Sequence, residues 1–216
     1  MTILSTPSKM PGKAFGLPAG RSCPWAVYQE SSDGRPAICS GCYAQDGFYR
    51  MPNVKATQEA RFQWVREALK SGEFVATMIE TIRGQGYFRI HDSGDFFNVT
   101  YVDAWRAIAQ ALPDTMFWAP TRSYQDARML AALRKLAKLP NVVIRPSALH
   151  FGDNAPKIAG LQAGSTADGP ASFDCPASLQ GGKCLDCRVC WTKPGTTVNY
   201  HVHGSKATKL VRISKA

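Results

Sequence analysis

The alternation of apolar and polar residues predicts a run of helices and strands in the middle of the chain. Helical spacing of apolar residues predicts helices over residues 57–70, 74–83, 102–112 and 124–138. Short apolar runs predict strands over residues 87–90, 116–119 and 142–144. These strands begin about 26–29 residues apart, which is the length of one βα unit. We therefore expect an α/β fold, a partial (βα) barrel with parallel strands and covering helices.

Outside this repeat the periodicity is weak. Residues 1–56 are rich in Gly, Pro and Ser and are predicted to form loops with one strand at Trp25–Tyr28. Residues 152–173 are predicted to be an irregular loop, and Val198–Val202 a final strand before a basic tail. We expect two parts, a partial barrel with an N-terminal cysteine loop over 1–150 and a cysteine-rich segment with the tail over 151–216.

Polar residues follow each of the three predicted central strands. These runs are His91-Asp92-Ser93-Gly94-Asp95, Pro120-Thr121-Arg122-Ser123 and Arg145-Pro146-Ser147. The carboxyl ends of parallel strands meet at one edge of a sheet, where α/β proteins bind ligands, so we expect a site there. The alternative is that these residues only form turns and helix caps, which explains Ser123 better than it explains the run from His91 to Asp95.

The composition is that of a globular protein. Hydrophobic residues make up 44% of the chain and charged residues 19%, which argues against disorder. No apolar run approaches the roughly 18 residues of a membrane-spanning helix, and the first residues contain no apolar segment typical of a secretion signal. We therefore expect a cytoplasmic protein rather than a membrane, fibrous or secreted one.

The charge is strongly basic. Lys and Arg number 26 against 16 acidic residues, giving a net charge of +10. The last sixteen residues carry only basic charges, on Lys206, Lys209, Arg212 and Lys215. Such a field favours polyanions, which means nucleic acid, nucleotides or acidic cofactors. The alternative is a basic protein whose charge serves only solubility.

Cysteine usage gives the clearest chemical signal. The seven cysteines are Cys23, Cys39, Cys42, Cys175, Cys184, Cys187 and Cys190. In a reducing compartment disulfides are not expected, and an odd number cannot pair completely. The close Cys-x2-Cys spacings instead indicate metal binding.

The late group (Cys175, Cys184, Cys187 and Cys190) offers four thiolates and can close a metal site alone. Zinc sites usually have two separated Cys-x2-Cys pairs. The late group instead contains a Cys-x2-Cys-x2-Cys run, which is typical of ferredoxin-like [4Fe–4S] binding. We therefore favour an iron–sulfur cluster here, with zinc as the alternative.

The early group (Cys23, Cys39 and Cys42) offers three thiolates. Three protein ligands leave one metal position open for a substrate or cofactor, as catalytic metal sites do. Alternatively, a histidine closes the site as a fourth ligand, from among His91, His150, His201 and His203.

Several short motifs resemble those of the "gene product 88" family of phage and mobile-element proteins. They are Ser8-Lys9-Met10-Pro11, Leu17-Pro18-Ala19-Gly20, Cys23-Pro24, Cys39-x2-Cys42-Tyr43-Ala44, the run His91 to Phe96, Thr121-Arg122-Ser123 and Tyr200-His201-Val202-His203-Gly204. The Cys39-x2-Cys42-Tyr43-Ala44 element is also similar to the cluster loop of radical S-adenosylmethionine (SAM) enzymes.

This resemblance implies a TIM barrel-like partial (βα) barrel and two clusters. A [4Fe–4S] cluster on the early group would bind SAM through its open iron, and the cluster on the late group would be auxiliary. An electron donor such as flavodoxin or ferredoxin is then expected as a partner. The chain departs from the usual Cys-x3-Cys-x2-Cys pattern, because fifteen residues separate Cys23 from Cys39.

The resemblance and the strand ends together assign site residues. The residues expected to bind the cofactor are Tyr43, Ser93, Gly94, Asp95, Thr121 and Ser147. The residues expected to act in catalysis are His91, Asp92, Asp95, Arg122 and Arg145. Asp92 and Asp95 would orient SAM, and Gly94 would let the backbone approach a ligand closely.

Arg122 and Arg145 are expected to neutralise a carboxylate or phosphate, and His91 to serve as an acid–base group or hydrogen-bond donor. The alternatives are surface arginines and a buried histidine whose hydrogen bonds are satisfied within the core.

Three functions are compatible with these patterns. The favoured one is a radical SAM-like enzyme with a nucleotide or nucleic-acid substrate. The second is a non-catalytic or redox-sensing iron–sulfur protein that binds nucleic acid by charge and stacking. The third is a zinc-stabilised phage accessory protein. No Gly-x-Ser-x-Gly or Walker-type loop is present, so a nucleophilic hydrolase or a P-loop enzyme is not expected.

Overall fold

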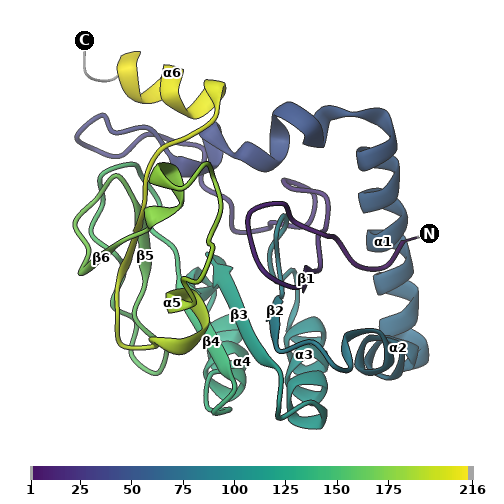
Figure 1. Cartoon of the computed structure of the whole chain (residues 1–216). Coiled ribbons are helices and arrows are strands. Elements are labelled where there is room, and N and C mark those ends of the chain that lie inside the picture. The colour runs from purple at the N-terminus through teal and green to yellow at the C-terminus, as the bar shows by residue number, and fades with distance from the viewer. Residues whose placement is uncertain (1, 214–216) are drawn as a thin grey trace.

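The first sheet contains four parallel strands in the order β1-β2-β3-β4 (Figure 1). The computed structural model describes residues 2–213 of the chain. The strands are β1 (Lys13–Ala14), β2 (Tyr87–Arg89), β3 (Met116–Thr121) and β4 (Val142–Pro146). The three predicted central strands are therefore confirmed as β2, β3 and β4. Strand β1 was not predicted, because two residues are too few to show a period.

Helices cover one face of this sheet. They are α1 (Pro52–Ser71), α2 (Glu73–Ile82), α3 (Val99–Ala111) and α4 (Ala127–Leu136). Helix α1 begins five residues before the predicted start, because Pro52 fits the first turn of a helix. The Asn98 side chain accepts a hydrogen bond from the Tyr101 N–H at 2.8 Å and caps α3. The Asp126 side chain caps α4 in the same way, and neither capping residue belongs to the three polar runs that follow the strands.

Side-chain alternation along the strands separates two environments. Phe88 and Phe117 pair in register and belong to the core against the helices. Arg89 and Trp118 also pair in register and face the other side, where Trp118 packs with Trp191 of α5 (Val189–Thr192). The Trp191 Nε1–H donates to the Phe88 carbonyl at 3.0 Å. The C-terminal segment therefore covers the sheet face that the helices leave free.

A second parallel sheet lies in the C-terminal segment. Its strands run in the order β5-β7-β6, with bounds β5 (Ser165–Ala167), β7 (Val198–Tyr200) and β6 (Phe173–Asp174). A parallel bridge between Ser147 and Ser165 links it to the first sheet, and the Ala148 N–H donates to the Ser165 carbonyl at 2.9 Å. The fold is thus mixed α/β with parallel strands in two sheets. The described residues form no closed barrel.

Three predictions outside the central repeat need correction. Trp25–Tyr28 is not a strand, because the chain turns there and the Ala26 N–H donates to the Cys23 carbonyl at 3.1 Å. The region 152–173 is not wholly irregular, since it contains β5 and the first residue of β6. The basic tail forms helix α6 (Ser205–Ile213), and Lys215 lies outside the described residues.

Short 3-10 turns lie between β1 and α1; one carries Cys39, and Cys42 lies between the first two. The 3-10 elements of the chain are η1 (Ile38–Gly41), η2 (Tyr43–Gln45), η3 (Gly47–Arg50), η4 (Ser123–Gln125) and η5 (Pro176–Leu179). Helix α6 packs on η1, at the top of Figure 1. In the part of the chain that the structure describes, no helix is both long and apolar enough to cross a membrane.

Candidate functional site

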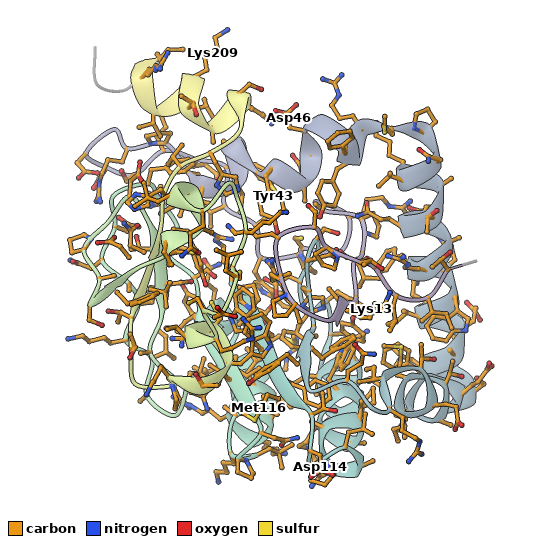
Figure 2. All side chains as sticks on the ribbon, in the orientation of Figure 1. Lys13, Tyr43, Asp46, Asp114, Met116 and Lys209 are labelled. Carbon is orange, nitrogen blue, oxygen red and sulfur yellow. The ribbon has the colours of Figure 1, made fainter. Side chains whose placement is uncertain are left out.

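A cavity of about 450 Å³ lies at the carboxyl edge of the first sheet. Its walls come from residues 7–26, which we call the N-terminal arm, and from the 3-10 turns before α1. The loops after β2, β3 and β4 and the C-terminal segment complete them. In Figure 2, Tyr43 lies in this region, whereas Met116, at the amino end of β3, lies at the opposite end of the sheet. The volume is that of a typical small-molecule site.

Six of the seven cysteines line this one cavity. They are Cys23, Cys39, Cys42, Cys175, Cys184 and Cys190. The seventh, Cys187, is next to the lining, since its N–H donates to the Cys184 carbonyl at 2.9 Å. All seven thiols are free and partly buried. The structure therefore brings two cysteine groups that are distant in sequence to one place.

The early group is assembled by two tight turns. The Cys42 N–H donates to the Cys39 carbonyl at 3.3 Å, and the Cys23 N–H donates to the Gly20 carbonyl at 3.4 Å. Burial raises the pKa of the Cys23 thiol to about 12, with Asp95, Cys42 and Cys39 acting in the same direction. The three thiols therefore lie within electrostatic reach of one another, and all three line the cavity.

The late group is held by the neighbouring backbone and by Tyr200. The Cys175 N–H donates to the Asn199 carbonyl at 2.9 Å, and the Cys190 Sγ lies 3.2 Å from the Tyr200 hydroxyl. Burial raises the pKa of Cys184, and Cys175 and Cys187 act in the same direction. Cys175 and Cys187 are thus within electrostatic reach of Cys184, and Cys175, Cys184 and Cys190 line the cavity.

The donors in both groups are thiols, which bind zinc as well as iron–sulfur clusters. Among the described residues, no group of three or more His, Cys, Asp or Glu side chains has the arrangement of a metal-ion site. The chemistry of the donors is nevertheless uniform, because each group consists of free thiols, the ligands that iron–sulfur clusters use. Cations accompany both groups. Arg122 and Lys206 act to lower the pKa of Cys42, against the larger effect of burial. Such cations favour the thiolate form, which is the one that binds metal.

Asp95 ties the loops after β2 and β3 together. Its Oδ1 accepts hydrogen bonds from the Thr121 hydroxyl at 2.6 Å and the Phe96 N–H at 2.7 Å. Its Oδ2 accepts one from the Arg122 N–H at 2.8 Å. Burial raises the pKa of Asp95, although these hydrogen bonds oppose the rise. Asp95 and Thr121 line the cavity, and this network fixes the shape of its edge.

Ser93 and Gly94 fit against the N-terminal arm. The Ser93 hydroxyl donates to the Leu17 carbonyl at 2.8 Å and accepts from the Gln58 side chain at 2.7 Å. Gly94 has φ of +83°, and a Cβ there would lie 2.5 Å from the Ser22 Oγ and 2.8 Å from the Leu17 Cβ. The close backbone approach that Gly94 permits is therefore to the chain's own arm, next to Cys23.

His91 and Asp92 are buried side by side at the cavity. The His91 Nε2 lies 3.1 Å from the Tyr101 hydroxyl, and the residue is 1% exposed. Burial, followed by the charge of Arg89, lowers the pKa of His91 to about 3, so its ring is neutral at pH 7. The Tyr43 hydroxyl donates to the Asp92 carbonyl. The Asp92 Oδ1 is buried and has no hydrogen-bond partner among the described residues.

Arg122 and Ser147 line the cavity from the loops after β3 and β4. The Arg122 Nε donates to the Ala148 carbonyl at 3.0 Å. The Ser147 hydroxyl lies 3.4 Å from that of Ser165. Both side chains thus keep polar atoms at the edge where we predicted a ligand.

Arg145 has a different environment from the one we expected. It is completely buried and does not line the cavity. Its Nη atoms donate to four backbone carbonyls, those of Ala163, Thr196, Val189 and Lys193, at 2.5–3.1 Å. Because its donors are used in this way, Arg145 joins β4 to the C-terminal segment and is not placed to bind an anion in the cavity.

Sequence reasoning missed two cavity residues, Arg89 and Trp118. The Arg89 guanidinium lies over the Trp118 ring, 4.6 Å from its centre, and its Nη2 donates to the Tyr43 hydroxyl at 3.1 Å. Both residues lie within strands that we assigned to the core. The available signal was a charged residue inside an apolar strand, between Phe88 and Ile90.

The C-terminal strap, residues 201–207, closes the cavity above the early group. The His203 ring stacks on Tyr43 with 6.0 Å between ring centres. The Ser205 hydroxyl donates to the Asp46 carboxylate at 3.0 Å, and Figure 2 shows Asp46 beside the start of α6. His201 and His203 both contribute to the lining.

Comparison with known proteins gives one family. The family described as "Gene product 88" matches residues 2–193. The "Gene 88 protein" of Mycobacterium phage L5 is 28% identical over 204 residues, and that of Mycobacterium phage D29 is 31% identical over 206. Each alignment covers 82% of this chain and 82% of the relative. No solved structure matches the chain.

Proposed function

The chain belongs to the gene product 88 family, and we propose that it is a radical SAM-like iron–sulfur enzyme. A [4Fe–4S] cluster is assigned to each cysteine group. One observation carries the proposal: six of the seven cysteines, from both groups, line the same cavity, at the sheet edge where parallel α/β proteins bind ligands. A purely structural metal site would have no need of a shared cavity of about 450 Å³.

The two groups have different roles in this proposal. Four thiols complete the coordination of a cluster at the late group, whereas three thiols at the early group leave one iron for SAM. Cys23, Cys39 and Cys42 would hold the cluster that, when reduced, would supply one electron for the cleavage of SAM and so for removal of a hydrogen atom from the substrate. Flavodoxin or ferredoxin is the expected electron donor.

The chain's own residues bind and orient the ligands. Asp95 keeps the Thr121 hydroxyl and the Arg122 backbone in place, and Asp92, whose Oδ1 lies against Gly16, lines the cavity beside it. Arg122 supplies positive charge at the cavity edge. The parallel bridge between Ser147 and Ser165 supports reading the two sheets as one open, partial (βα) barrel around these groups.

A nucleotide or nucleic acid is the proposed substrate class. The net charge of +10 favours a polyanionic partner. The two relatives named above come from phages, and a nucleic-acid substrate is compatible with that origin. A cytoplasmic location follows from the need to keep the thiols reduced.

The test is SAM cleavage. The protein is purified without oxygen, reduced with dithionite and incubated with SAM, and 5′-deoxyadenosine is quantified by chromatography. We expect its formation by the wild type and its loss in Cys42→Ser. Cys187→Ser is the matched control in the late group, and it should retain SAM cleavage at the early group. Absence of 5′-deoxyadenosine from an iron-loaded wild type would contradict the proposal.

A second candidate is a non-catalytic or redox-sensing iron–sulfur protein that binds nucleic acid. Helix α6 supports it, because Lys206, Lys209 and Arg212 lie on one short helix that packs on the early turns. Figure 2 shows Lys209 pointing away from the body of the protein. This candidate predicts salt-dependent binding of single-stranded oligonucleotides without SAM cleavage.

A further inference from the structure

Two buried N–H donors on the cavity wall have no acceptor among the described residues. They are the Arg89 Nε and the Trp118 Nε1. Both residues line the cavity. Buried donors are nearly always hydrogen-bonded in native proteins, so two neighbouring exceptions require an explanation.

The two donors are fixed next to each other. Arg89 and Trp118 are paired in register on β2 and β3, and the guanidinium lies over the indole ring with 4.6 Å between them. The Arg89 Nη2 donates to the Tyr43 hydroxyl at 3.1 Å, which holds the guanidinium in this position. The Nη1 lies 3.6 Å from the Met10 sulfur, a weak acceptor.

No carboxylate of the described residues lies within ion-pair distance of the Arg89 guanidinium, although the buried Asp92 acts on it electrostatically. Among the ion pairs of the described residues, none joins Arg89 to a carboxylate. Burying a cation without a paired anion is unfavourable. The N–H groups of Trp105 Nε1, Arg106 Nε and Arg145 Nε also lack acceptors among the described residues, but those three residues do not line the cavity.

We propose that Arg89 and Trp118 together bind an oxyanion, a carboxylate or phosphate group of the ligand that occupies the cavity. Such a group would accept from both the Arg89 Nε–H and the Trp118 Nε1–H, and it would neutralise the guanidinium. The inference rests on the proposed function in one respect only, that this cavity is the ligand site. It narrows the substrate class to molecules with an acidic group.

A cluster bound by the late group is the main alternative acceptor for the Arg89 and Trp118 N–H groups. Arg89 acts to lower the pKa of Cys184 and of Cys190, although burial raises both, so it lies within electrostatic reach of these thiols. A cluster there could accept hydrogen bonds from the same two donors through its sulfurs. Anion titrations of matched variants separate the two cases.

The probes are inorganic phosphate and acetate, titrated into the anaerobically purified, iron-loaded protein by calorimetry at constant ionic strength. We expect saturable binding of at least one probe, and the stronger probe identifies the oxyanion. Trp118→Phe keeps an aromatic ring under the guanidinium and removes only the N–H, so the affinity should fall about fivefold or more. Arg89→Met should abolish binding, and Arg89→Lys should restore part of it.

The matched control is Arg128→Met, an exposed arginine on α4 outside the cavity lining, which should bind like the wild type. Lack of saturable binding by the iron-loaded wild type would overturn the inference. Unchanged anion affinity in Trp118→Phe and Arg89→Lys, together with a shifted reduction potential of the late cluster, would assign both donors to the cluster instead.

Metal analysis separates this inference from the proposed function. If the anaerobically purified protein holds no iron but binds phosphate or acetate through Arg89, the binding would support the oxyanion site and the lack of iron would contradict the iron–sulfur proposal. Iron-loaded protein that cleaves SAM but binds neither anion would support the iron–sulfur proposal and contradict the oxyanion site.

Discussion

The carboxylate of Asp95 and the hydroxyl of Thr121 form a 2.6 Å hydrogen bond that joins the ends of β2 and β3 at the edge of the cavity. The same carboxylate accepts from two backbone N–H groups. Asp95→Asn replaces one acceptor oxygen with an NH2 group, which cannot accept a hydrogen bond. We expect it to lower the free energy of unfolding by about 2–3 kcal/mol, measured by urea denaturation at pH 7.

Asp103→Asn provides the control for Asp95. Asp103 lies 3.5 Å from Arg106 in an exposed ion pair on α3. Its loss should change the unfolding free energy by less than about 0.5 kcal/mol. Equal effects of the two substitutions would show that Asp95 does not hold the edge of the cavity.

Gly94 should be intolerant of a side chain for two separate reasons. Gly94→Ala introduces strain at φ of +83° and a contact with Ser22 and Leu17. Gly84 has φ of +81°, and a Cβ there would meet no atom of the described residues within 4 Å. Gly84→Ala therefore measures the strain alone, about 1–2 kcal/mol. We expect Gly94→Ala to cost at least about 1 kcal/mol more, because the arm must move.

The displaced arm carries Cys23, so Gly94→Ala should also weaken metal retention at the early group. Iron and sulfide content after gel filtration, compared with Gly84→Ala, measures this effect. Equal iron content and equal stability in the two variants would contradict the packing of Gly94 against the arm.

His91 should make stability depend on pH. Burial lowers its folded-state pKa to about 3, whereas an unfolded histidine titrates near 6.5. Between these values only the unfolded chain binds the proton. The contribution of His91 to stability is therefore complete above about pH 6.5 and decreases as the pH falls, by about 2 kcal/mol at pH 5.

The measurement is urea denaturation of wild type and His91→Asn at pH 7 and pH 5. The wild type should lose about 2 kcal/mol more than the variant between these values. The difference between the two proteins isolates His91 from the buried carboxylates, which titrate in both. Parallel pH profiles would mean that His91 is protonated in the folded protein.

Arg145 should be required for the order of the C-terminal segment. Arg145→Met leaves four carbonyls without their donor, so the free energy of unfolding should fall by about 3 kcal/mol or more. Hydrogen exchange should increase over residues 189–198. Arg134→Met is the control, since Arg134 donates to one carbonyl at the surface, that of Ala159, at 2.8 Å. Unchanged exchange over 189–198 in Arg145→Met would contradict this role.

The central strands and helices could be predicted because their patterns are long enough to show a period. Helix α4, for example, buries Met129, Leu133 and Leu136 at helical spacing. Strands β1, β5 and β6 have two or three residues each and are defined by pairing with distant strands, which leaves no local signal.

The cysteine groups could be identified from spacing, but their meeting at one cavity could not. That meeting depends on contacts such as the Cys184 N–H donating to the Lys9 carbonyl at 2.7 Å, across most of the chain. The different environments of Arg145 and Arg89 could not be predicted from the sequence either. Arg145 and Arg89 both belong to strands, and only the packed structure shows that one meets carbonyls and the other a cavity.

Iron analysis with low-temperature EPR tests the central claim, two clusters on one cavity with the early one open to SAM. The protein is purified without oxygen, reduced with dithionite and measured with and without SAM. The proposal predicts about eight irons per chain and a cubane signal that changes when SAM is added, with the change lost in Cys39→Ser. Zinc in place of iron, or about four irons with a signal that SAM leaves unchanged, would contradict it.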